Sequence, residues 1–166
     1  MNVTILRRVG VAAALVLALV VSGRAQTLAP FKFQGVIHDN ADALNANWVI
    51  SGPWSLELRG DSGKANFTAS LTMKQNGPVP GGPHTHHIFL KDASVTVLTN
   101  GYSVTGIAAI AGNGGLGSKY ASSPVTVEVT GGADLPLSNI KVFLQSTDAT
   151  DHFGTDPLNG VVVYQP

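Results

Sequence analysis

The sequence contains no cysteine in its 166 residues. This absence excludes disulfide bonds, thiolate metal ligands and cysteine nucleophiles, so stability has to come from a hydrophobic core. Charge is also scarce, because only 12% of the residues are Asp, Glu, Lys or Arg, with ten acidic and ten basic residues. The basic residues are scattered singly rather than gathered into a patch. We therefore expect no nucleic-acid partner.

Long apolar runs are missing except near the beginning of the chain, where Arg7 and Arg8 precede an uncharged run from Val9 to Val21. These 13 residues are too few for a membrane-spanning helix, which needs roughly 18 to 20. The small residues Gly23 and Ala25 stand where a signal peptidase recognises the −3 and −1 positions of its cleavage site. This pattern is typical of a secretory signal peptide.

We accordingly predict a cleaved signal peptide over residues 1–25 and a single mature domain over residues 26–166, with no membrane span in the mature chain. Cleavage would leave 7 basic against 10 acidic residues, so the mature protein would be mildly acidic. The expected location is secreted or periplasmic. An exported domain of this size without disulfides is more typical of a bacterial envelope than of animal secretion.

Helical periodicity is scarce as well. The segment from Asp39 to Asn47 is the one candidate helix, because its alanines and leucine fit about two turns after an Asp or Asn cap. The segment from Thr147 to Pro157 has no clear periodicity and is expected to be a polar loop.

What the mature sequence does contain is alternation of apolar and polar residues, interrupted by clusters of glycine, proline and asparagine. The segment Lys64 to Gln75 is typical: every second residue is apolar, and its partner from Trp54 to Arg59 repeats the pattern across a Gly-Asp-Ser-Gly turn. About eight to ten such strands, spaced by frequent turns, predict an all-β, single-domain antiparallel β-sandwich or flattened β-barrel. The alternation does not distinguish the two.

Three of the five histidines lie together in His84-Thr85-His86-His87, after a loop rich in glycine and proline. In a strand, alternation places His84 and His86 on the apolar face shared with Ile88 and Leu90, and His87 on the opposite face. Two histidines at positions i and i+2 lie about 7 Å apart along a strand, a spacing that allows both to bind one zinc or copper ion. The pair resembles the His-x-His strand of cupins, but the glutamate that follows in cupins is absent here.

A third ligand has to come from elsewhere in the chain. The candidates are His152, in the segment expected to be a polar loop, and His38, at the end of the first expected strand. Asp148 and Asp151 flank His152 in sequence and are possible additional ligands. The alternative is that these histidines serve only as hydrogen-bonding groups at a sheet end.

Three functions follow from these observations. The first is a non-enzymatic exported protein that binds a transition metal or a small ligand at the histidine cluster. The second is a metal-dependent enzyme that uses the same histidines. The third is an interaction or adhesion domain that uses the glycine-rich loops. The sequence favours the first, and it leaves the substrate, the protein or small-molecule partner and the metal undetermined.

Overall fold

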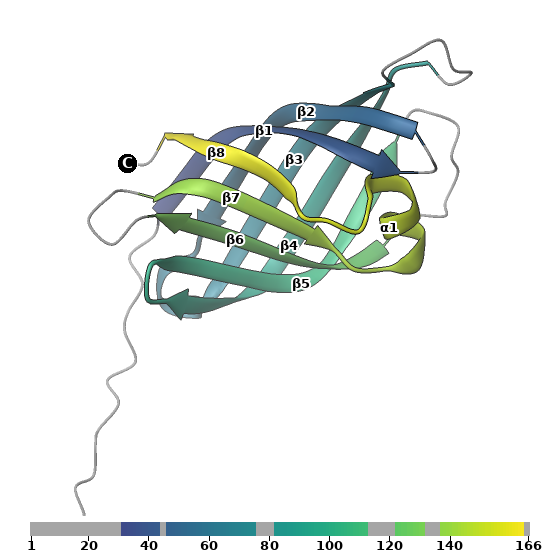
Figure 1. Cartoon of the computed structure of the whole chain (residues 1–166). Coiled ribbons are helices and arrows are strands. Elements are labelled where there is room, and N and C mark those ends of the chain that lie inside the picture. The colour runs from purple at the N-terminus through teal and green to yellow at the C-terminus, as the bar shows by residue number, and fades with distance from the viewer. Residues whose placement is uncertain (1–30, 44–45, 76–81, 113–121, 132–136, 165–166) are drawn as a thin grey trace, which may run out of the picture.

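The computed structural model describes residues 31–43, 46–75, 82–112, 122–131 and 137–164. Within these residues, eight antiparallel strands form one closed barrel in which each strand pairs with the next and β8 pairs with β1 (Figure 1). The strands are β1 (Phe31–Ala43), β2 (Ala46–Leu58), β3 (Lys64–Gln75), β4 (His84–Leu98), β5 (Gly101–Gly112), β6 (Ser122–Gly131), β7 (Leu137–Leu144) and β8 (Leu158–Tyr164). A 3-10 turn, η1 (Gly60–Ser62), joins β2 to β3, and one short helix, α1 (Thr147–Phe153), lies between β7 and β8.

The all-β prediction is confirmed, and the architecture is the barrel rather than the two-sheet sandwich. The number of strands falls within the predicted range. The predicted signal peptide, residues 1–25, lies outside the described residues, as does most of each glycine-rich loop. Among the described residues, α1 is the only α-helix, and no helix has the length and apolar character that a membrane span requires.

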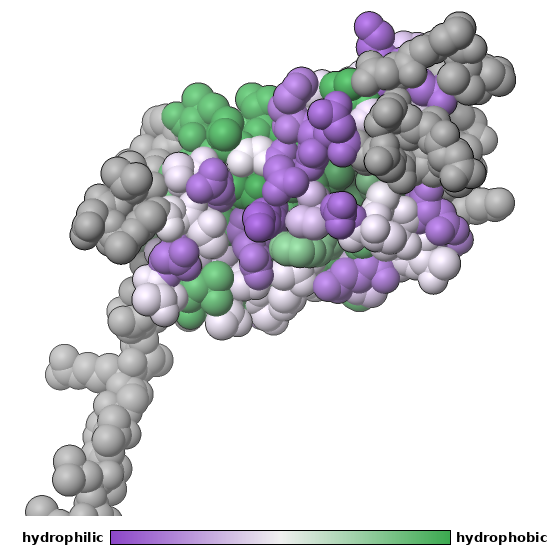
Figure 2. Space-filling model, viewed as in Figure 1, coloured by the Kyte–Doolittle hydropathy of each residue, from purple (hydrophilic) through white to green (hydrophobic). Residues whose placement is uncertain are grey.

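The barrel interior is filled by the apolar face of each strand. In β3 the buried residues alternate with partly or fully exposed ones along the whole strand, as the sequence predicted. The same alternation buries Trp54, Leu56 and Leu58 of β2. An eight-stranded barrel has an interior just wide enough for side chains to fill, and here they form one continuous core. The face of the barrel seen in Figure 2 mixes hydrophilic and hydrophobic residues.

Two expectations about helix were wrong. In the segment Asp39 to Asn47, expected to be a helix, the described residues instead form the end of β1 and the beginning of β2, and Ala41 pairs with Trp48 and Asp39 with Ile50. Strand pairing along the barrel wall overrides the weak helical preference of so short a segment. Conversely, the segment expected to be a polar loop contains α1.

Closure between β8 and β1 depends on a glycine. At Gly35 the pairing register of β1 with β8 shifts, and the indole Nε1 of Trp54 donates a hydrogen bond to the carbonyl of Val161, 3.3 Å away. A Cβ atom at Gly35 would lie 1.9 Å from that carbonyl oxygen and 2.8 Å from the indole nitrogen. Only glycine leaves room for the two groups to meet beside the β1 backbone.

We therefore predict that Gly35→Ala destabilises the barrel by about 3 kcal/mol or more, at or beyond the upper end of the usual cost of overpacking. Equilibrium unfolding in urea, followed by tryptophan fluorescence, measures this change. Gly82→Ala is the matched control, because a Cβ atom there would meet no atom within 4 Å. Equal stability of the two variants would show that the close approach at Gly35 is unimportant.

Candidate metal centre

Two histidines enter the barrel interior from the beginning of β4. His84 and His86 pair with Met73 and Leu71 of β3, and all four side chains are buried. His87, between His86 and Ile88, is exposed on the outer face, as alternation predicted. The third histidine, His152, comes from α1, which lies at one end of the barrel (Figure 1).

Local hydrogen bonds fix the helix that carries His152. The Ser146 side chain caps α1 by accepting a hydrogen bond from the Ala149 N–H at 3.3 Å. The buried Ser123 hydroxyl on β6 accepts further hydrogen bonds from the N–H groups of Gln145 and Ser146. Within α1, Ala149 and His152 are buried three residues apart on one face. The cap and the buried face together orient His152 into the barrel.

The three imidazoles converge through their Nε2 atoms. His152 Nε2 lies 2.8 Å from His86 Nε2 and 3.2 Å from His84 Nε2. Three ligands of a tetrahedral zinc ion, with Zn–N bonds of 2.0–2.1 Å, have nitrogens about 3.3 Å apart. The ligand atoms of His84, His86 and His152 all lie within 4.8 Å of one another, so the cluster could hold a metal ion once the rings turn to equalise these distances.

A backbone carbonyl orients one of the three rings. His84 Nδ1 lies 3.3 Å from the carbonyl oxygen of Gly82, and only a protonated Nδ1 can donate to that oxygen. His84 Nε2 then carries the lone pair and faces the other two histidines. A carbonyl partner for the remote nitrogen is the usual arrangement around metal-bound histidines.

Aromatic and small residues surround the cluster. The Trp48 ring contacts His84 with centroids 5.3 Å apart, and the Phe153 ring contacts His86 and His152, in each case at 5.0 Å. Gly112 on β5 faces His86, and a Cβ atom there would lie 2.6 Å from His86 Nδ1. The imidazoles are thus packed in a largely apolar environment, and the glycine at position 112 leaves space for the His86 ring.

This environment disfavours protonation. Burial, together with the neighbouring histidines, lowers the pKa of His86 to about 4. Burial, together with His84, lowers the pKa of His152 to about 4 as well. Both imidazoles are therefore neutral at pH 7, which is the form that binds a metal.

The structure brings together His84, His86 and His152, but not the other candidate ligands. His38 is exposed on the outer face of β1, because the inward positions beside it are taken by Ile37 and Gly35. Asp148 and Asp151 are exposed on α1, since the buried face of the helix carries His152 instead. In the described part of the chain, no carboxylate belongs to the cluster.

Comparison of the chain with models of protein families, with curated proteins and with solved structures found no match. Any functional inference must therefore come from the residues themselves.

The lowered pKa values predict how the stability of the metal-free protein depends on pH. In the unfolded chain these histidines take up protons near pH 6.5, whereas in the folded protein they do so only near pH 4. The unfolded state therefore binds more protons between these values, and stability falls as the pH is lowered from 6.5 to 4. We expect a loss of about 3 kcal/mol between pH 7 and pH 4.5, allowing for coupling between the two groups.

Urea unfolding of the metal-free protein at both pH values measures this loss. His152→Gln should reduce it, because one of the two buried groups no longer titrates. His38→Gln, at an exposed position, should leave it unchanged. A loss of the same size in all three proteins would show that other groups cause the acid sensitivity.

Proposed function

We propose that this is an exported metal-binding protein that holds one zinc or copper ion between His84, His86 and His152. The convergence of the three buried Nε2 atoms is the observation that carries the proposal. Neutral imidazole is a good ligand for both metals, and the chain has no thiolate to compete with it. Three protein ligands would leave a further coordination position for water or a small ligand.

Metal binding would also link two distant parts of the fold. His84 and His86 belong to the barrel wall, whereas His152 belongs to the helix between β7 and β8. An ion bound to all three joins α1 to β4, so binding to the folded state alone raises stability. An ion present at 100 times its Kd would add about 2.7 kcal/mol.

The proposal is for binding rather than catalysis. Many metal-dependent enzymes use an acid or base close to the ion, but the two aspartates nearest His152 in sequence are exposed rather than part of the cluster. The enzymatic alternative therefore has no specific support. Adhesion through the glycine-rich loops stays a prediction, because residues 76–81, 113–121 and 132–136 lie outside the described part of the chain.

The test is equilibrium binding to protein purified without an affinity tag. Isothermal titration with zinc and with copper should show one ion per chain for at least one of the two metals, and a chelator should lower the melting temperature of the loaded protein. His86→Ala should weaken binding by about 100-fold or more. Loss of a residue that hydrogen-bonds to a metal-bound histidine typically costs 10- to 100-fold in metal affinity, and loss of the ligand itself should cost at least as much.

His87→Ala is the matched control, since it removes an imidazole from the neighbouring position on the exposed face. It should bind the metal as the unmodified protein does. The proposal is wrong if the unmodified protein binds neither metal, or if the two histidine variants bind equally well.

A further inference from the structure

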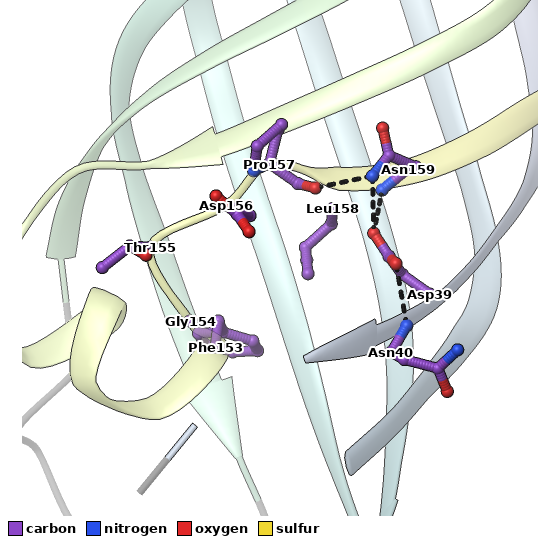
Figure 3. Close-up of a pocket in the computed structure, with 9 residues that line it drawn as sticks. All are labelled: Asp39, Asn40, Phe153, Gly154, Thr155, Asp156, Pro157, Leu158 and Asn159. Carbon is purple, nitrogen blue, oxygen red and sulfur yellow. Dashed lines mark hydrogen bonds between the residues drawn. The ribbon is translucent and has the colours of Figure 1, made fainter. Parts of the chain in front are cut away.

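A surface pocket lies beside the end of α1. Its volume is about 190 Å³, enough for several water molecules. It is bounded by the ends of β1 and α1 and by the segment that leads into β8 (Figure 3). The lining residues are Asp39, Asn40, Phe153, Gly154, Thr155, Asp156, Pro157, Leu158 and Asn159.

Phe153 belongs both to this pocket and to the surroundings of the metal centre. It lines the pocket, and its ring also contacts His86 and His152 with centroids 5.0 Å away in each case. Phe153 is 1% exposed, so its side chain is packed into the end of the barrel. One residue therefore both lines a water-accessible pocket and contacts two of the three candidate ligands.

The wall of the pocket is suited to a cation. It carries the carboxylates of Asp39 and Asp156 and has no lysine or arginine. The Asp39 carboxylate has a structural task, because it accepts hydrogen bonds from the N–H and the side-chain amide of Asn159 (Figure 3). Asp156 is exposed and projects from the loop after α1. Like-signed charges at the mouth of a pocket raise the local concentration of counter-ions.

From this arrangement we infer that the pocket is the route by which the metal ion reaches the histidine cluster, and that Phe153 is the gate. The inference rests on the proposed metal binding. Phe153 is the last residue of α1, and Gly154 follows with φ of 93°, a conformation that favours glycine. A local opening at this helix end moves the ring without breaking the barrel pairing. The gate controls how fast the ion enters and leaves.

The experiment measures rates on the full-length protein. Stopped-flow absorption follows the association of Co²⁺, and mixing the loaded protein with excess chelator follows its release. Phe153→Ala should raise both rates about tenfold, which corresponds to a barrier lower by about 1.4 kcal/mol. Phe153→Leu, a smaller change to the core, should raise both rates to a lesser extent and provides a second measurement if the alanine variant folds poorly.

Two changes at the pocket mouth test the route without altering the core. Asp156→Phe should slow both association and release by filling the pocket. Asp156→Asn should slow association about twofold at low ionic strength and less at high ionic strength, since salt screens exposed charges. Phe89→Ala, at an exposed phenylalanine on the outer face of β4, is the control and should change neither rate.

The outcomes separate the two claims. If the unmodified protein binds no Co²⁺, Zn²⁺ or copper at equilibrium, the proposed function fails and the gate fails with it. If it binds metal but both Phe153 variants and Asp156→Phe keep the unmodified rates, the metal site stands and the gate is wrong. Faster rates in the Phe153 variants, with slower rates in Asp156→Phe, support the route and its gate.

Discussion

Closure of the sheet between β8 and β1 is the constraint on which the rest of the structure depends. A closed barrel has no exposed edge, and every second residue of each strand faces one interior. The closing strands require Gly35, which lets Trp54 reach the Val161 carbonyl. The hydrogen bonds that Asn159 donates to the Asp39 carboxylate fasten β1 to the beginning of β8. The same closure places α1, which immediately precedes β8, at the end of the barrel where β4 begins.

Polar side chains that face this interior have to be compensated. His84 and His86 occupy inward positions on β4. Burial and the neighbouring imidazoles disfavour a positive charge on His86. The rings contact one another through their ring nitrogens, and His84 also meets the Gly82 carbonyl. Three converging imidazoles are a set of ligands that could hold a metal ion.

Much of the wall of this barrel could be predicted from the sequence, because strand alternation is a local property. The buried faces of β3 and β2 and the inward direction of His84 and His86 follow from single-residue alternation. The helix was missed because seven residues are too few for a clear period. Its signals were the Ser146 cap, Asp148 in the first turn and Gly154 after the last residue. His152 was a candidate by residue type alone, since its contact with His86 spans 66 positions.

The position of α1 bears on how the site would bind metal. An isolated helix of seven residues is unstable in water, so tertiary contacts must hold α1 in place. The structure supplies them through the Ser123 and Ser146 hydroxyls and through the buried Ala149 and Phe153 side chains. None of these contacts needs a metal, and the Nε2 atoms already lie at 2.8 and 3.2 Å. Contacts within the barrel thus bring the three histidines together, unlike small domains that fold only when metal binds. If the cluster binds metal, the ion needs a means of access to this buried position, and Phe153 is the residue that both lines the pocket and contacts His86 and His152.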